Sequence, residues 1–115
     1  MKHEIKRYYN SDNTIHQEEH YCDNKQHRED GPAVIWYRRD GSIELEQYWI
    51  NNQVHREDGP AEIRYSYPSG YVITEKYWNK GKDYTKLVWN WFIINNLICK
   101  DMKKEDFNRM WMEIL

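Results

Sequence analysis

The sequence has few of the residues from which metal, disulfide and phosphate sites are built. Its 115 residues include two cysteines, Cys22 and Cys99, which lie far apart and belong to no CxxC or Cys/His cluster. Neither a disulfide framework nor a zinc site is indicated, and such thiols suit a reducing cytoplasm. The five glycines are isolated, so no glycine-rich loop is present to hold a phosphate. We therefore expect no metal and no cofactor.

Long apolar segments and an excess of positive charge are also missing. Charges or amides interrupt every hydrophobic stretch well short of a bilayer span, and no apolar run of signal-peptide length follows the first residues. Lys and Arg total 17 against 19 Asp and Glu, a net charge of -2. Such a chain has no general electrostatic attraction for nucleic acid or an anionic membrane. We expect a cytoplasmic protein that binds no membrane and for which nucleic acid is a disfavoured partner.

Aromatic residues, by contrast, are abundant. A mean hydropathy of -1.12 and 31% charged residues are typical of disordered chains, but six Trp, ten Tyr and two Phe are not. The length suits one compact domain. We expect residues 1–115 to form a single domain that buries aromatic rather than aliphatic side chains.

A repeat of about 28 residues dominates the chain. The heptapeptide His-Arg-Glu-Asp-Gly-Pro-Ala occurs at 27–33 and again at 55–61, and the pair Tyr48-Trp49 recurs as Tyr77-Trp78 with one extra residue in the spacing. The extra residue falls in a turn, where insertions are tolerated. A degraded first copy precedes these two, and its matching residues are Tyr9, Asp12, Ile15, Glu18 and Tyr21.

Each copy is predicted to form a β-hairpin. Residues 32–37 and 42–50 are rich in β-branched and aromatic residues and are bounded by Asp-Gly turns. Three hairpins over residues 5–84 would form an antiparallel β-meander of about six strands. One face is expected to carry the core, because it stays apolar from copy to copy. Its residues are Ala33, Ile35 and Tyr37, with Ile43, Leu45 and Trp49 on the second strand.

The opposite face of the predicted sheet is expected to be a variable surface. Val34 and Trp36 in one copy become Glu62 and Arg64 in the next. Aromatic and arginine side chains are enriched where proteins bind one another. The predicted partner-contacting residues on this face are Val34, Trp36, Arg38 and Arg64.

The repeated segment, His-Arg-Glu-Asp-Gly-Pro-Ala followed by a glycine turn and Tyr-Trp, resembles the MORN-like repeat variant. This variant occurs in tandem in bacterial, bacteriophage and giant-virus proteins, among them an antitoxin-like group. The resemblance covers roughly residues 5–84. It implies a single-layer antiparallel meander used for binding, with no common enzymatic activity. The Tyr-Gly pattern of the wider MORN group is absent, so the lipid functions proposed for that group do not carry over.

After Tyr84 the spacing of apolar residues becomes helical. The stripe of one amphipathic helix is Leu87, Trp91, Ile94 and Ile98, broadened by Val88 and Phe92. A second helix is expected after Glu105-Asp106, with Phe107, Met110, Trp111, Ile114 and Leu115 as its apolar residues. Residues 85–115 would form two short helices that cap the sheet. Alternatively, these helices would present Trp111 to a partner or to a second copy of the chain.

The two His-Arg-Glu-Asp segments place His, Glu and Asp together, but hairpin geometry argues against a catalytic or metal site. Matching residues of successive hairpins lie two strands, about 9.6 Å, apart, so His27 and His55 cannot share a metal at bonds of about 2.1 Å. No Gly-x-Ser-x-Gly elbow is present either. We expect no enzymatic activity.

We expect the two segments to be structural loops instead. Asp30 and Asp58 would bond the turn backbone, and Arg28 and Arg56 would pair with neighbouring acids. Backbone freedom before proline would come from the two glycines of the motif, Gly31 and Gly59.

These features predict a non-enzymatic protein-binding module. By analogy with the proteins that it resembles, the most specific hypothesis is a small phage or mobile-element inhibitor that acts in the host cytoplasm. Such an inhibitor would occlude a host defence protein such as a CRISPR effector. An antitoxin that covers a cognate toxin would act similarly. The alternatives are a structural protein that forms a homodimer through its C-terminal helices, and a single-stranded nucleic-acid binder that stacks bases on Trp36.

Overall fold

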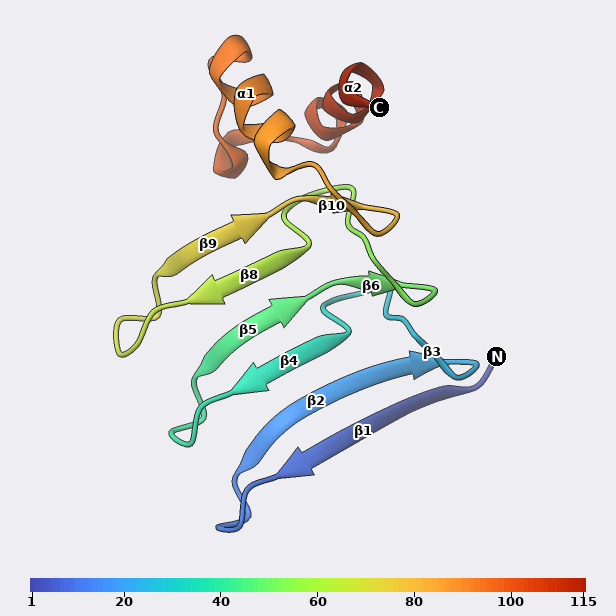
Figure 1. Cartoon of the computed structure of the whole chain (residues 1–115), viewed down its shortest axis with the longest axis vertical. Coiled ribbons are helices and arrows are strands. Elements are labelled where there is room, and N and C mark those ends of the chain that lie inside the picture. Colours follow the sequence, from blue (N-terminus) through green and yellow to red (C-terminus); the bar gives the residue numbers. More distant parts are fainter.

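A computed structural model describes all 115 residues and has a single-layer antiparallel sheet with two helices at one end (Figure 1). Six strands lie side by side in the order β1-β2-β4-β5-β8-β9. They are β1 (His3–Tyr9), β2 (Ile15–Cys22), β4 (Val34–Tyr37), β5 (Ile43–Gln47), β8 (Glu62–Tyr65) and β9 (Val72–Lys76). Every neighbouring pair is antiparallel. The predicted meander of hairpins with a helical C-terminus is confirmed.

A row of short hairpins follows the second strand of each pair. The C-terminal end of β2 pairs with β3 (Lys25–Gln26), β6 (Trp49–Ile50) pairs with β7 (Gln53–Val54), and β10 (Trp78–Asn79) pairs with β11 (Lys82–Asp83). Both turn residues of each hairpin have positive φ, as type I′ turns require. The turns are Asp23-Asn24, Asn51-Asn52 and Lys80-Gly81.

The short hairpins split a segment that the sequence had suggested was one strand. Residues 42–50 form two strands, β5 and β6, with Tyr48 between them. The Asn51-Asn52 pair directly after β6 is a hairpin signal that would have revealed the split.

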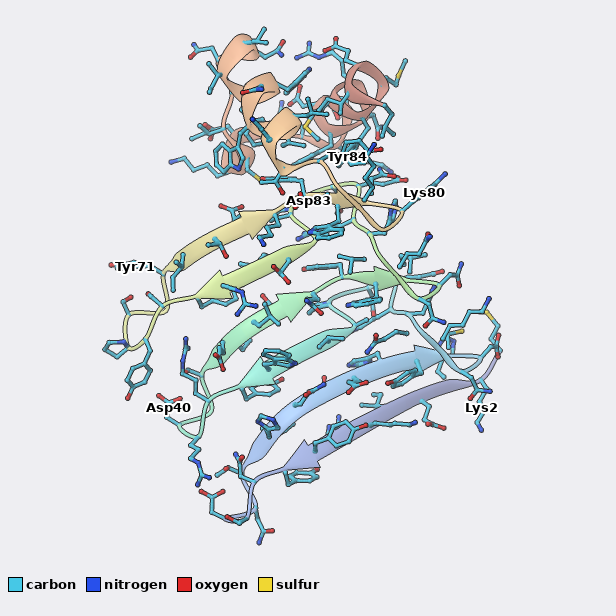
Figure 2. All side chains as sticks on the ribbon, viewed as in Figure 1. Lys2, Asp40, Tyr71, Lys80, Asp83 and Tyr84 are labelled. Atoms are coloured by element: carbon cyan, nitrogen blue, oxygen red, sulfur yellow. The ribbon has the colours of Figure 1, made fainter.

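At the strand ends opposite the short hairpins, aspartate side chains stabilise the turns that connect the strands. Asp12 Oδ1 accepts a hydrogen bond from the backbone N of Thr14 at 3.1 Å, and Asp40 Oδ1 accepts one from the backbone N of Ser42 at 2.9 Å. Hydrogen bonds from the Thr14 and Ser42 hydroxyl groups lower the pKa of both carboxyl groups. In Figure 2, Asp40 and Tyr71 lie at these strand ends, and Lys80 lies at the opposite strand ends, where the short hairpins are.

Buried side chains lie on both faces of the sheet, so the predicted division into a core face and a surface face is wrong. Ile35 is buried on one face. Val34, with 4% of its surface exposed, and Leu45, which is fully buried, lie on the other, because Leu45 pairs in register with Trp36. In a single layer, long side chains on neighbouring strands cover short ones. Val34 lies in register between Glu19 and Gln47.

The cluster of contacting buried hydrophobic side chains lies at the helical end of the molecule. The helices are α1 (Thr85–Asn95) and α2 (Lys104–Ile114), joined through the short 3-10 turn η1 (Cys99–Asp101). The Tyr77 and Phe92 rings meet edge to face at 5.7 Å, which ties the end of the sheet to α1. The members of the cluster are Tyr77, Val88, Trp91, Phe92, Phe107, Met110 and Trp111.

The helices cap only one corner of the sheet. Figure 1 shows both helices beyond β9, next to β10, and not over a face of the sheet. Ile73 and its neighbours on β9 stay largely exposed, and β9 pairs only with β8. None of the helices combines the length and the apolar character needed to cross a bilayer.

Candidate functional site

The two His-Arg-Glu-Asp-Gly-Pro loops make the same internal contacts. Arg28 Nε donates to Asp30 Oδ1 at 2.9 Å and its Nη1 donates to the Pro32 carbonyl at 3.2 Å. In the second loop, Arg56 Nε donates to Asp58 Oδ1 and Nη1 donates to the carbonyl of the following proline, both at 3.0 Å. Asp30 and Asp58 thus accept from arginine and not from the turn backbone. Each arginine closes its own loop.

Gly31 and Gly59 give each guanidinium group the space it needs. A Cβ atom added to Gly31 would lie 3.0 Å from Cζ of Arg28, and one added to Gly59 would lie 2.8 Å from Cζ of Arg56. Among the five glycines, only the three outside the motif, Gly41, Gly70 and Gly81, have positive φ. The motif glycines therefore allow close approach of a side chain, and not the backbone freedom that the sequence had suggested.

The two loop histidines are held by the short hairpin of the next repeat. His27 Nδ1 accepts a hydrogen bond from the backbone N of Asn51 at 3.0 Å, and His55 Nδ1 accepts one from the backbone N of Lys80 at 2.9 Å. The ring proton of each neutral histidine therefore lies on Nε2. His27 Nε2 lies 3.3 Å from the Glu29 carboxylate and His55 Nε2 lies 3.4 Å from that of Glu57.

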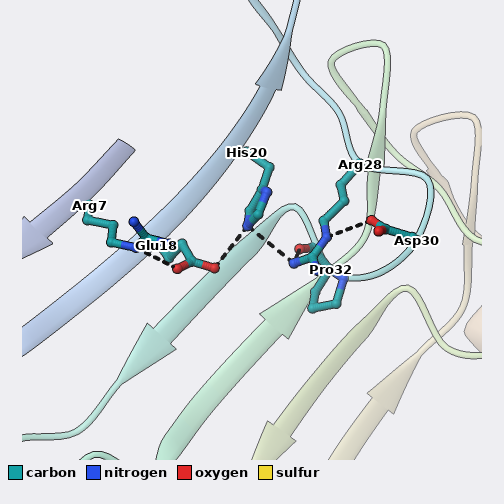
Figure 3. A network of polar contacts seen from close by, with 6 residues as sticks. All are labelled: Arg7, Glu18, His20, Arg28, Asp30 and Pro32. Atoms are coloured by element: carbon teal, nitrogen blue, oxygen red, sulfur yellow. Dashed lines mark hydrogen bonds and ion pairs between the residues drawn. The ribbon is translucent and has the colours of Figure 1, made fainter. Parts of the chain in front are cut away.

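A polar network links the first loop to the N-terminal strands (Figure 3). Arg7 Nε donates to Glu18 Oε1 at 3.0 Å, and His20 Nε2 lies 2.9 Å from Glu18 Oε2 and 3.2 Å from Arg28 Nη1. Burial opposes ionisation of Glu18, but hydrogen bonds from His20 and Arg7 outweigh it and lower the pKa of this carboxyl group. The network keeps Glu18 ionised and orients it, as a structural ion pair does.

The second loop has an aromatic contact where the first has the histidine. Tyr48 takes the place of His20, and the Arg56 guanidinium lies over the Tyr48 ring, 4.0 Å from its centre. Burial raises the pKa of the Tyr48 hydroxyl. In the third copy the corresponding Tyr77 is fully buried in the helical cluster.

An open groove of about 580 Å³ lies between the two loops, which we call the loop groove. Residues 28–31 and 55–58 form its walls, and Tyr48 and Ile50 form its floor. The carboxylates of its walls face solvent, whereas the two guanidinium groups are drawn back into the loops.

Most of the residues predicted to contact a partner on the variable sheet face are buried or engaged within the protein. Val34 is buried, and the indole Nε1 of Trp36 is buried without a hydrogen-bond partner. Arg38 donates to the carbonyls of Ile43 at 3.0 Å and Tyr65 at 2.6 Å, so it ties two neighbouring repeats together. Of the four predicted residues on this face, only Arg64 is well exposed.

Trp111, the residue predicted to contact a partner from the helices, is likewise engaged within the protein. It is buried, and its Nε1 donates to the carbonyl of Glu57 in the second loop at 2.8 Å. Its ring meets that of Tyr84 edge to face at 5.9 Å. Trp111 therefore joins α2 to the repeat sheet. The sequence carries no signal for this contact, because it joins residues 54 positions apart.

The outward face of α1 and the residues just after it carry an exposed apolar surface, and the sequence placed only part of it in the apolar stripe of the helix. Of the predicted apolar stripe, the structure buries Trp91 and the broadening residues Val88 and Phe92. It leaves Leu87, Ile94 and Ile98 exposed. Ile93 and Ile94 are 76% and 81% exposed, and the remaining exposed apolar residues nearby are Leu87, Trp89 and Ile98. A helix with apolar residues all round has an uncovered apolar face when only one side is packed. We call this set the α1 face.

No group of three or more His, Cys, Asp or Glu side chains is arranged to hold a metal ion. Burial raises the pKa of the Cys99 thiol, which disfavours thiolate chemistry at this residue.

Comparison with family models, curated proteins and solved structures found no match for this chain. Its resemblance to the MORN-like repeat variant therefore stays a prediction from the repeated residues.

Proposed function

We propose that the protein is a non-enzymatic binding module that docks α1 into an apolar groove on another protein. The observation that carries the proposal is the α1 face, in which Leu87, Trp89, Ile93, Ile94 and Ile98 are exposed on one side of the molecule. They form an exposed patch with several large apolar side chains. Such patches mark interaction sites.

The width of the α1 face favours a concave partner. Successive residues of a helix are about 100° apart, so the exposed apolar side chains from Trp89 through Ile93 and Ile94 to Leu87 span an arc of about 160°. The exposed Lys86 and Asn90 lie within the same arc. A second convex helix covers only a narrow stripe of such an arc, whereas a groove covers most of it. This geometry supports a different protein as the partner rather than a second copy of this chain.

The rest of the molecule holds α1 in a fixed position. Val88, Trp91 and Phe92 anchor the inner side of the helix in the buried cluster, and Tyr77 ties that cluster to the sheet. A helix that is already folded and anchored loses little conformational entropy on binding. The repeat sheet therefore acts as a rigid support, and α1 lies at the end of the long axis of the molecule (Figure 1).

Binding of this kind would act by occlusion at one-to-one stoichiometry. The proposed biological forms are a phage or mobile-element inhibitor that covers a host defence protein, or an antitoxin that covers a cognate toxin. Both forms require a stable complex and no turnover.

Affinity capture from a lysate of the natural host tests the proposal. The bait is the wild-type chain, the Ile94→Glu variant or the matched control Ile73→Glu, which puts the same charge on an exposed isoleucine of β9. We expect the same partner with wild type and Ile73→Glu, in a one-to-one complex, and at least about tenfold less with Ile94→Glu, because a charge is placed in an apolar contact. Equal capture by all three baits would overturn the proposal, as would a wild-type homodimer that Ile94→Glu dissociates.

A further inference from the structure

A second surface, separate from the α1 face, lies along the two repeated loops. The same position beside the loop is filled by a tryptophan in the second repeat and is open in the first. In the filled version, the Trp111 indole lies against the second loop and donates to the Glu57 carbonyl at 2.8 Å. The indole comes from α2, which is remote in sequence from the loop. This loop therefore already receives a tryptophan from a helix that packs beside it.

The open version lies one repeat earlier, at the loop groove. Glu29 is the residue that corresponds to Glu57, and its carbonyl accepts no hydrogen bond within the protein. The groove floor there is formed by Tyr48 and Ile50, whereas the matching Tyr77 and Asn79 are covered by the helical end. The same acceptor, in the same loop conformation, is thus left beside open space.

The charge of the loop groove indicates which partner would suit it. The carboxylates of Glu29, Asp30, Glu57 and Asp58 have exposed fractions of 82%, 87%, 66% and 72%. The guanidinium groups of Arg28 and Arg56 are only 28% and 23% exposed, and each already donates to an aspartate and to a proline carbonyl. The surface that a ligand meets is therefore acidic.

We propose that the loop groove binds a basic segment of another protein that inserts a tryptophan indole and donates its N–H to the Glu29 carbonyl. Lysine or arginine residues of that segment pair with the four exposed carboxylates. A second copy's α2 is a poorer occupant, because the three acidic residues of segment 103–115 offset its three basic ones and because Trp111 is already used in its own fold.

The probe for this site is a fluorescein-labelled peptide with the sequence of residues 103–115 carrying Glu105→Lys, Asp106→Lys and Glu113→Lys. Fluorescence anisotropy follows its titration with the full-length chain, in which α2 keeps its own place. We expect saturable one-to-one binding that weakens as salt is raised. A matching peptide in which tryptophan is replaced by phenylalanine lacks the indole N–H, and we expect it to bind at least about tenfold more weakly.

Two double variants of the protein locate the binding. Glu29→Gln with Glu57→Gln removes two groove charges but keeps acceptors for His27 and His55, whereas Glu44→Gln with Glu105→Gln removes two exposed charges elsewhere. Melting curves first show that both are folded. We expect only the groove variant to lose at least about tenfold in affinity.

Three results would overturn the proposal. They are equal binding by the two double variants, equal binding by the tryptophan and phenylalanine peptides, or equal binding by a peptide with the natural acidic residues. The last result would assign the groove to α2 of a second copy.

Discussion

Residues 3–76 and residues 77–115 are held together by different kinds of contact. The sheet has no cluster of contacting buried hydrophobic side chains; it is held by backbone ladders and by arginine, histidine and aspartate contacts that recur from loop to loop. The helical end has seven buried hydrophobic residues in one cluster. The polar contacts of one loop can recur in any number of further repeats. The hydrophobic cluster occurs once and ends the row of repeats. The exposed apolar surface lies at the terminating end.

The largest expected loss of stability comes from truncating an apolar side chain in the helical end, and the same change in the sheet serves as the comparison. Phe92→Ala removes a buried ring from the cluster, and we expect a loss of about 3–5 kcal/mol in the free energy of unfolding. Ile63→Ala on the half-buried sheet surface serves as the control and should cost clearly less. Urea unfolding followed by far-ultraviolet circular dichroism measures both. Equal losses would contradict the contrast between the regions.

A double-mutant cycle in the second loop gives the next largest effect. Gly59→Ala pushes the Arg56 guanidinium away from its contacts with Asp58 and the Pro60 carbonyl, so we expect a loss of about 1–2 kcal/mol. Arg56→Ala removes the same contacts and should cost a similar amount. Because both act through one group, the double variant should lose little more than either single variant. Additive losses would show that the glycine has another role.

Acidification should weaken the sheet before the helical end. The carboxyl groups whose pKa is lowered in the folded protein are Asp12, Glu18, Asp30 and Asp40, all in the sheet region. A lowered folded-state pKa stabilises the protein above the unfolded-state value, here 3.8 for Asp and 4.5 for Glu, and this stabilisation is lost as pH falls through the folded-state value. Amide hydrogen exchange from pH 7 down to pH 3, corrected for intrinsic rates, should show loss of protection first in β1, β2 and β4. Earlier loss in α1 and α2 would contradict this.

The smallest expected effect on stability belongs to the binding surface itself. Ile94→Glu changes a side chain that is 81% exposed and outside the buried cluster, so we expect a change within about 0.5 kcal/mol in the free energy of unfolding. Thermal melting of this variant beside Ile73→Glu measures it. A large loss would mean that Ile94 supports the fold and is not free for a partner.

The hairpins and the two helices could be predicted because local signals determine them. Asp-Gly turns, strand-forming residues and the change to helical spacing after Tyr84 are all present in the sequence. The sheet faces could not be assigned in this way, because in a single layer neither face is excluded from water and long neighbours cover residues such as Val34 and Leu45.

The side of α1 that stays exposed is determined by tertiary contacts, and these could not be predicted from the sequence. From Leu87 to Ile94 every residue except Asn90 is apolar, so two different stripes fit a helical period equally well. The structure packs the stripe that contains Val88 and Phe92 and exposes the one that contains Leu87 and Ile94. The pairing of Trp111 with the Glu57 carbonyl was equally hidden, because no local pattern links a helix to a loop so distant in sequence.

The most direct test of the central claim is hydrogen–deuterium exchange of the protein with and without its captured partner. If α1 is the docking element, the partner should slow exchange in Thr85–Asn95 and leave β1, β2 and β9 unchanged. Slowed exchange across the sheet strands, with α1 unaffected, would contradict the claim that the sheet is a support and the helical end is the binding surface.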